Sequence, residues 1–238
     1  MNLSQKINEL KKSGIFEYLD FMKSGYTYNQ KEKMQISVKY NDVSIPGVNT
    51  EDLILSQIKS QINTTFYNNI ISDLFYTEFY SVIDFRNSDF ETMFLDNIVN
   101  TFKELSGYKN IILSCNLGCL FQEVYSFSSA SGKINNSSHI YKIGNLFGYL
   151  DIWVDPYMKF NDTRILGFND VYIDIDNIEI NVNNNYTIKP TKIIADFDYS
   201  YSKQSSKVLY LLSDDSDPIV FSEYKKIERD IKINKILE

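Results

Sequence analysis

The sequence predicts an α+β fold, in which helical segments come first along the chain and strands follow. Two patterns lead to this prediction. Apolar side chains recur at every fourth residue from Ile54 to Leu74, as on a helix, whereas apolar and polar residues alternate after residue 140, as in strands. The chain has 238 residues, of which 43% are hydrophobic, so it can bury one large core or two smaller ones.

Composition excludes several classes of protein. The formal net charge of −7 and the small number of arginines (Arg86, Arg164 and Arg229) argue against a nucleic-acid-binding surface, because neutralising phosphates requires clustered Lys and Arg. No apolar stretch of ~18 residues is present, so we expect no membrane span. The N-terminal residues also lack the apolar core of a secretory signal. Two cysteines are too few for a disulfide scaffold.

The first half of the chain contains the longest predicted helix. Residues 1–33 form an N-terminal arm, and residues 34–40 alternate like a strand. From Thr50, which suits an N-cap, a helix over residues 50–74 runs without a glycine or proline. Its apolar row drifts by ~40° per four-residue step, so we expect the helix to contact different partners along its length. The row consists of Ile54, Ile58, Ile62, Phe66, Ile70 and Leu74.

Shorter elements follow the long helix. After an extended piece over residues 75–85, a capping box at Ser88 begins a helix that ends at Gly107. A buried-type strand over residues 110–113 then leads into a helix with one apolar face. Residues 126–139 are rich in Ser, Asn and Gly, which favours a loop. The strands predicted beyond this loop are residues 150–154, 164–168, 171–175, 187–197, 207–212 and 218–224.

Few residues of the chain suit catalysis. His139 is the only histidine, which excludes a His-based triad or a metal site with several His ligands. Cys115 and Cys119 would lie on one helix face, but two thiols alone cannot complete a tetrahedral zinc site. We therefore predict that both are buried and unbridged. No phosphate-binding loop, nucleophile elbow or zinc motif is present, which favours a structural protein over an enzyme.

Two pairs of aspartates are the remaining candidates for chemistry. Asp174 and Asp176, and likewise Asp196 and Asp198, would align on one face of a strand. Such pairs can bind a cation or supply general acid and base groups. The same alternation with apolar residues is also what a half-exposed strand produces. We therefore predict solvated surface residues here and no metal site.

Four segments, taken in order, resemble the major capsid proteins of T-even-type phages. Residues 51–63 are similar to the spine-helix segment of that family, and residues 108–114 to its short strand. Residues 142–157 contain a Gly-x-Leu-x-Gly turn, a strand and then Val-Asp-Pro-Tyr, as the family does, and residues 165–168 follow as a similar piece follows there. The signature residues are Gly144, Gly148, Val154, Asp155, Pro156 and Tyr157.

The resemblance implies the Hong Kong-97-type capsid fold, in which a spine helix lies beside a sheet in a peripheral domain and an axial α/β domain is added. In this chain it implies an N-terminal arm over residues 1–33 and a peripheral-type region over residues 34–105. An axial-type region over residues 106–200 and C-terminal strands returning to the peripheral region over residues 201–238 would follow. The family's extended loop would be short or missing, because only residues 40–50 separate the first strand from the helix. The long N-terminal region that the family processes during head maturation would be absent.

The function implied by the resemblance is that of a structural subunit of a tailed-phage capsid that self-assembles into hexamers or pentamers. The chain would be a compact shell protein or a minor relative, such as a vertex or decoration subunit. It would be no enzyme and need no cofactor or metal. Its partners would be copies of itself and other capsid proteins, with packaged DNA met only indirectly and no membrane. It would reside in the virion after assembly in the host cytoplasm.

Two other functions remain open from the residues alone. The chain could be a soluble ligand- or carbohydrate-binding module, in which exposed Tyr and Trp side chains line a groove. It could instead be a hydrolase that uses the aspartate pairs.

Overall fold

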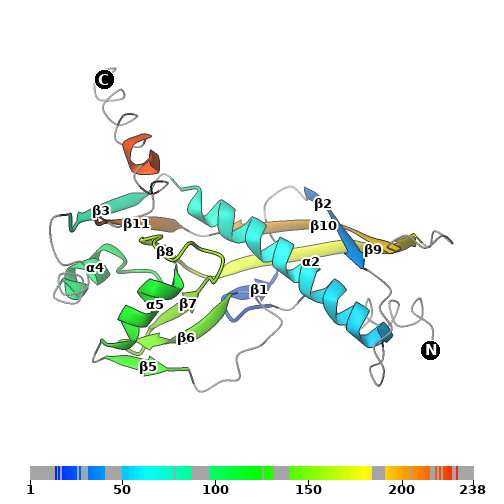
Figure 1. Ribbon diagram of the computed structural model, residues 1–238, viewed down its shortest axis with the longest axis horizontal. Coiled ribbons are helices and arrows are strands. Elements are labelled where there is room, and N and C mark those ends of the chain that lie inside the picture. Colours follow the sequence, from blue (N-terminus) through cyan, green and yellow to red (C-terminus); the bar gives the residue numbers. More distant parts are fainter. Residues whose placement is uncertain are drawn as a thin grey trace. The chain divides into compact units, whose positions relative to one another are not determined.

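The structure is a computed structural model and describes residues 14, 16, 18–25, 27, 32–40, 50–77, 79–86, 97–124, 126–130, 140–183, 191–203, 205–214, 218, 220, 222–226 and 229. It confirms the α+β class, with helices and two separate sheets (Figure 1). The chain divides into two compact units, each built from two separated segments. Unit 1 consists of Met1–Ser72 and Asp170–Lys203, and unit 2 of Asp73–Asn169 and Gln204–Glu238.

A four-stranded sheet and a long helix form unit 1. The strands, in sheet order, are β1 (Met22–Ser24), β9 (Val171–Asn183), β10 (Thr191–Lys203) and β2 (Glu32–Tyr40). Strand β10 pairs antiparallel with both β9 and β2, whereas β1 pairs parallel with β9. Helix α2 (Thr50–Phe75) runs along this sheet (Figure 1).

The predicted long helix is confirmed as α2, with its apolar row on the buried side. Five members of the row are at most 1% exposed: Ile58, Ile62, Phe66, Ile70 and Leu74. The side chain of Ile54 lies outside the described residues. The ring of Phe66 packs against Phe197 and Tyr199 of β10, at centroid distances of 6.2 Å and 5.6 Å. These contacts fix the helix on its sheet.

The last turn of α2 belongs to unit 2. The Oγ of Ser206 donates a hydrogen bond to the carbonyl oxygen of Leu74 over 3.0 Å. The guanidinium of Arg164 lies 5.1 Å from the centre of the Phe75 ring. Phe66 and Leu74 therefore have different partners, as the drift of the apolar row predicts.

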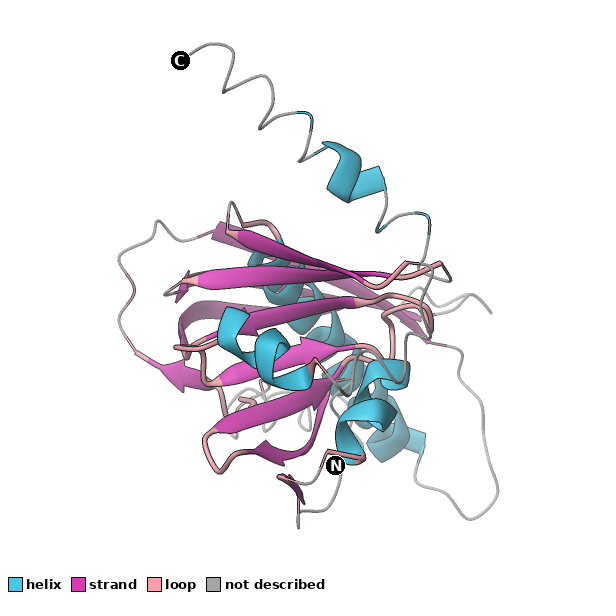
Figure 2. Cartoon of the chain, turned by 90° about the vertical axis from the view of Figure 1, so that its left-hand side faces the viewer, coloured by secondary structure: helices cyan, strands magenta, loops and turns pink. Residues whose placement is uncertain are grey.

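A seven-stranded sheet forms the centre of unit 2, and its strands are among those drawn in magenta in Figure 2. In sheet order they are β3 (Tyr80–Asp84), β11 (Ser206–Leu212), β8 (Arg164–Phe168), β4 (Asn110–Leu113), β7 (Leu150–Val154), β6 (Tyr141–Leu146) and β5 (Phe127–Ser129). The β3–β11 and β4–β7 pairs are parallel, and the other pairs are antiparallel. Helices α4 (Ile98–Glu104) and α5 (Cys115–Gln122) contribute to its core.

The predicted strands over residues 110–113 and 150–154 are confirmed as the central parallel pair. Ile111 lies opposite Ile152, and both are fully buried in one cluster with Leu117 and Phe121 of α5. The apolar stripe of α5 therefore faces the sheet, as its spacing predicts.

Three predictions of element placement need correction. The predicted strand over residues 218–224 is wrong, because the described residues there are helical, with Val220 buried. Pro218 fits the start of a helix, where its missing N–H group has no partner to lose. The predicted loop over residues 126–139 contains the short strand β5, and Phe75 ends α2 instead of beginning an extended piece. The predicted capping box at Ser88 lies outside the described residues.

The two units also differ from the predicted division into residues 34–105, 106–200 and 201–238. Strands β9 and β10 share a sheet with β2, so they belong to unit 1. Strand β11 pairs with β3 and β8, so all three belong to unit 2. Pairing between strands far apart in sequence decides the division. No helix within the described ranges is both long and apolar enough to cross a membrane.

Candidate functional site

The predicted signature residues lie on one hairpin and the turn after it. Gly144 is in β6, Gly148 is in the turn between β6 and β7, and Val154 ends β7. The Asp-Pro-Tyr sequence follows directly, from Asp155. The signature therefore belongs to unit 2, at the β6 side of its sheet.

Gly144 is required by close packing between β6 and β5. A Cβ atom at this position would lie 2.4 Å from the Phe127 ring and 2.4 Å from the carbonyl oxygen of Ser128. Both distances are far inside van der Waals contact, and one of the two atoms belongs to the backbone. Only glycine lets the two strands approach in this way.

The hairpin turn holds a bulky side chain in a backbone conformation that favours glycine. Phe147 has a φ of 56° and Gly148 a φ of 76°, and the N–H of Tyr149 donates to the carbonyl oxygen of Leu146 over 3.3 Å. Positive φ at both central residues is the geometry of a type I′ turn, in which Asn-Gly is the favoured sequence. A phenylalanine here costs roughly 1–3 kcal/mol.

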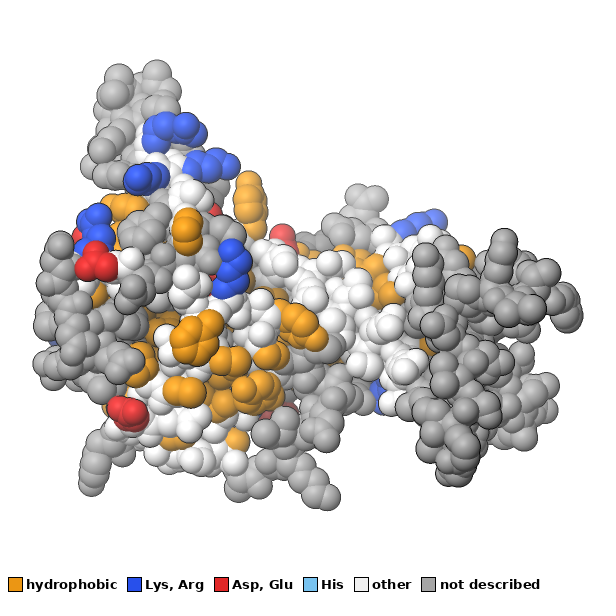
Figure 3. Space-filling view, in the orientation of Figure 1, with side chains coloured by type: hydrophobic (Ala, Val, Ile, Leu, Met, Phe, Trp, Pro, Cys, Tyr) orange, Lys and Arg blue, Asp and Glu red, His pale blue; other side chains and the backbone are white. Residues whose placement is uncertain are grey.

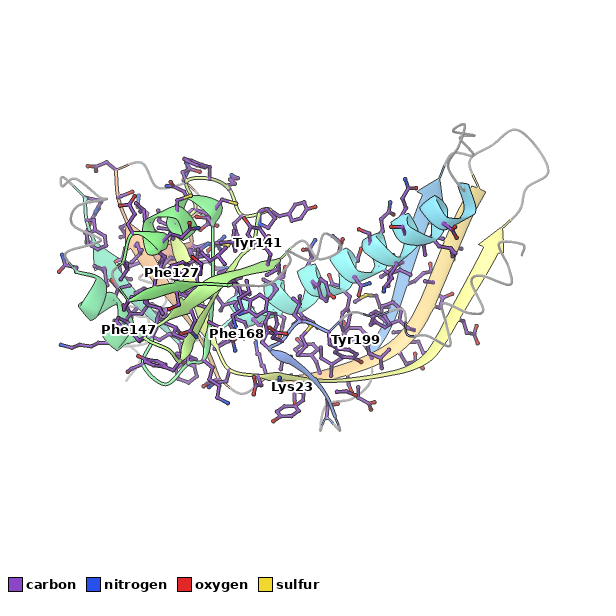
Figure 4. The ribbon with its side chains drawn as sticks, turned by 90° about the horizontal axis from the view of Figure 1, so that it is seen from below. Lys23, Phe127, Tyr141, Phe147, Phe168 and Tyr199 are labelled. Atoms are coloured by element: carbon purple, nitrogen blue, oxygen red, sulfur yellow. The ribbon has the colours of Figure 1, made fainter. Side chains whose placement is uncertain are left out.

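The strained phenylalanine connects the surface of unit 2 to its core. Its ring meets the buried Phe102 ring edge to face at a centroid distance of 5.2 Å, and stacks on Tyr149 at 6.2 Å. Phe147 remains 42% exposed and Tyr149 58% exposed. The turn therefore presents two partly exposed aromatic rings, of which Phe147 is labelled in Figure 4.

The Asp-Pro-Tyr turn is built around a buried carboxylate. The N–H of Asp155 donates to the carbonyl oxygen of Leu113, and Oδ1 of Asp155 accepts from the N–H of Tyr157 over 2.8 Å. This side-chain-to-backbone bond is an Asx-turn. Asp155 is 7% exposed, whereas Tyr157 is 59% exposed. Asp155 therefore shapes the turn, and the turn presents Tyr157.

A largely buried arginine at the start of β8 is bonded to the C-terminal helix. Nε and Nη2 of Arg164 donate to the two carboxylate oxygens of Asp162, over 2.9 Å and 2.6 Å. Nη1 donates to Oε2 of Glu223 over 2.7 Å. Burial would lower the pKa of the guanidinium, but these carboxylates raise it above its ordinary value. Burial raises the pKa of the neighbouring Tyr210 to about 12, and the charge of Glu223 acts in the same direction.

The predicted aspartate pairs belong to the four-stranded sheet of unit 1. Asp196 and Asp198 are half-buried and line a groove of about 660 Å³ together with Lys33, Gln35 and Glu179. Nε2 of Gln35 donates to Oδ1 of Asp196 over 2.7 Å. In the described part of the chain, no group of three or more His, Cys, Asp or Glu side chains is placed to hold a metal ion. The side chain of Asp176 and all of His139 lie outside that part.

The only tryptophan is buried, which removes one basis of the carbohydrate-binding alternative. Trp153 is 3% exposed, and its Nε1–H donates to Oδ1 of Asn110 over 3.2 Å. It therefore cannot line an open groove. Its burial on β7 shows that both faces of this strand are covered.

The prediction for the cysteines is partly wrong. Both thiols are free, but Cys115 is only half-buried and Cys119 is exposed. The buried residues of α5 are Leu117, Gly118, Leu120 and Phe121, which lie on the opposite face of the helix. The 100° step per residue already places Cys119 about 180° from the centre of that face.

Hydrophobic side chains gather on one surface of unit 2. Figure 3 shows them over the part that contains α5, β6 and β7. In this part Val124, Tyr141 and Ile143 are half-buried and Cys119 is exposed. Contiguous apolar surface of this kind marks interaction sites in soluble proteins.

No protein-family model matches the chain, and no curated protein matches it in sequence. Among solved structures, it is similar to a virus-like particle from Pyrococcus furiosus, with 10% identity, a TM-score of 0.43, and 77% of this chain and 78% of the other covered. It is similar to a structure from Mycobacterium phage Che8, with 13% identity, a TM-score of 0.42, and 75% of this chain and 70% of the other covered. It is also similar to the SrpI encapsulin of Synechococcus elongatus PCC 7942, with 11% identity, a TM-score of 0.43, and 79% of this chain and 74% of the other covered.

Proposed function

We propose that this protein is a structural subunit of a tailed-phage capsid shell and assembles with copies of itself into hexamers or pentamers. The observation that carries the proposal is the pairing of a 26-residue helix and a four-stranded sheet in one unit with a mixed α/β sheet in the other. A spine helix beside a sheet, together with an α/β domain, is the arrangement that the sequence resemblance implies. Unit 1 would be the peripheral-type domain and unit 2 the axial-type domain.

Exposed aromatic side chains support self-association. Aromatic residues are enriched where protein surfaces meet, because they bury much apolar area at low entropic cost. Among the described residues of unit 2, six aromatic side chains are at least 42% exposed: Tyr76, Phe79, Phe147, Tyr149, Tyr157 and Phe160. An isolated subunit loses stability and solubility by displaying such rings, whereas a subunit of a shell gains contact area from them.

The finer assignments rest on the signature hairpin. Its Gly-x-Leu-x-Gly turn and Val-Asp-Pro-Tyr sequence favour the T-even-type capsid family, as a compact shell protein or a vertex-type relative. The subunit would act without enzymatic chemistry. Its partners would be further copies and other capsid proteins, with DNA met only indirectly and no membrane contact. It would be assembled in the host cytoplasm and remain in the virion.

Light scattering after size-exclusion chromatography tests the proposal. A shell subunit should elute as assemblies whose mass is many times the 27.8 kDa of one chain, with the fraction assembled rising with protein concentration. A binding module or a small hydrolase should elute at the mass of one or two chains at every concentration. That second outcome would contradict the proposal.

A further inference from the structure

The C-terminal helix buries little of its own surface. The described residues 218, 220, 222–226 and 229 are helical, and Figure 1 draws a part of this helix in red near the end of the chain. Among these residues only Val220 is buried, and Glu223 and Tyr224 are half-buried. The others are exposed. Segments with so few buried apolar side chains open locally at a low cost in free energy.

Arg164, at the start of β8, is the residue of the sheet to which this helix is bonded. Its Nη1 donates to Oε2 of Glu223 over 2.7 Å, and its guanidinium lies 5.1 Å from the centre of the Phe75 ring. The side chain of Glu223 is 40% exposed, whereas that of Arg164 is 19% exposed. Water therefore reaches the carboxylate of this ion pair more readily than the guanidinium.

Asp162 holds the guanidinium in place independently of the helix. Nε and Nη2 of Arg164 donate to the two carboxylate oxygens of Asp162, and Oδ1 also accepts from the backbone N–H of Arg164 over 3.1 Å. The Asp162 side chain is 6% exposed. Departure of Glu223 therefore leaves Arg164 with a charge partner, whereas loss of Asp162 removes its bidentate one.

We propose that the C-terminal helix is a strap that opens while the sheet of unit 2 stays folded, and that the Glu223–Arg164 bond keeps it closed. Asp162 is buried and makes two bonds to the guanidinium, so this pair persists as long as β8 remains in the sheet. Glu223 is partly in water and makes one such bond, so water replaces Arg164 at low cost. Opening separates Val220 and Glu223 from the sheet. It does not depend on whether the chain builds a shell.

The cationic residues of the strap provide a way to detect its opening. Lys225, Lys226 and Arg229 are exposed, and Figure 3 shows Lys and Arg side chains gathered in this part of the molecule. Trypsin cleaves after each of them, but only when the helix has opened around the bond. When opening and closing are fast, the cleavage rate follows the population of the open form.

Limited trypsin digestion of the full chain, read by mass spectrometry, tests the proposal. Cleavage after the three residues of the strap should be at least about tenfold faster than cleavage after Lys207, which lies in β11 and is protected by the folded sheet. Glu223→Gln should speed cleavage of the strap by about tenfold, because a bond between charged groups is lost, and should leave cleavage after Lys207 unchanged. Equal acceleration at both places would show that strap and sheet open together. No acceleration would show that Glu223 does not keep the strap closed. Either result contradicts the proposal.

Two variants separate this effect from a change in charge or in overall stability. Glu179→Gln removes the same charge from an exposed position in unit 1 and should keep the wild-type cleavage of the strap. Asp162→Asn takes the bidentate partner from a largely buried guanidinium, so it should lower the melting temperature and speed cleavage after Lys207. Glu223→Gln should keep the wild-type melting temperature, because the sheet unfolds as before. A melting temperature as low as that of Asp162→Asn would make Glu223 part of the sheet's own stability and overturn the proposal.

Discussion

The ring of Phe147 meets the ring of Phe102 edge to face, with 5.2 Å between the centroids and 89° between the planes. Phe102 is 6% exposed and Phe147 is 42% exposed, so one contact joins the core of unit 2 to its surface. Phe147 occupies a left-handed turn position that glycine would adopt without strain. The ring contact is therefore made at a cost in backbone energy.

Phe147→Gly should reduce assembly while leaving the free energy of unfolding nearly unchanged. The change relieves roughly 1–3 kcal/mol of backbone strain and removes a partly exposed ring contact, so the two effects largely offset each other. We expect the free energy of unfolding in urea to change by less than about 1.5 kcal/mol. If the turn lies at a contact between subunits, light scattering should show a marked loss of assembled mass.

Phe102→Ala is the matched control for this variant. Phe102 is buried, so its truncation should cost about 3–5 kcal/mol of unfolding free energy and reduce the amount of folded protein. Wild-type assembly by Phe147→Gly would show that this turn takes no part in a subunit contact.

Ile62→Ala tests the packing of α2. Ile62 is fully buried on α2, so the change removes transfer energy and leaves a cavity, at a cost of about 2–5 kcal/mol in the free energy of unfolding. The exposed neighbour Gln61 offers the comparison, and Gln61→Ala should change the same quantity by less than about 0.5 kcal/mol. Equal effects of the two variants would overturn the assignment of the buried face.

Substitutions of the two signature glycines, Gly144 and Gly148, should destabilise the protein for different physical reasons. Gly144→Ala forces a Cβ atom to 2.4 Å from the Ser128 carbonyl oxygen, so overpacking should cost about 1–3 kcal/mol or more. At Gly148 nothing lies within 4 Å of an added Cβ, and only the φ of 76° opposes a side chain. Gly148→Ala should therefore cost about 1–2 kcal/mol, and Gly148→Asn should recover part of that loss because Asn tolerates a left-handed backbone. Denaturant unfolding of the three variants measures this order.

Tyr210 should make the protein sensitive to alkaline pH. Its pKa is raised to about 12 in the folded protein, chiefly by burial, against an ordinary value of 10.0. A group whose pKa is raised on folding stabilises the protein fully below its unfolded pKa, and this stabilisation is lost as the pH rises through the folded pKa. Stability should therefore fall between about pH 10 and pH 12, and Tyr210→Phe should flatten this part of the profile. An unchanged slope in Tyr210→Phe would show that other groups cause the fall.

The main elements could be predicted from the sequence wherever local pattern and final environment agree. The four-residue period from Ile54 to Leu74 gave α2, and the alternation from Leu150 to Val154 gave β7, because each element buries one continuous stripe. At residues 218–224 the sequence pattern predicts a strand, whereas the described residues are helical. Apolar residues there resemble a strand, but Pro218 and the long-range pair of Glu223 with Arg164 favour a helix.

The contacts of the candidate site were harder to predict from the sequence, because most of them join residues far apart along the chain. Asp162 is two residues from Arg164, but nothing local indicates that Arg164 also joins Glu223 and the Phe75 ring. The division into units likewise depends on the pairing of β10 with β2, whose residues are more than 150 positions apart. The exposed position of Cys119, in contrast, follows from helix geometry once the buried face of α5 is known.

Electron microscopy of the purified protein shows whether copies of this chain build a closed shell. We expect closed, hollow particles of uniform diameter in the fraction of high mass, and their loss when subunit contacts are disrupted. Fields that contain only dispersed single chains of 27.8 kDa, at concentrations where the protein is folded, would contradict it.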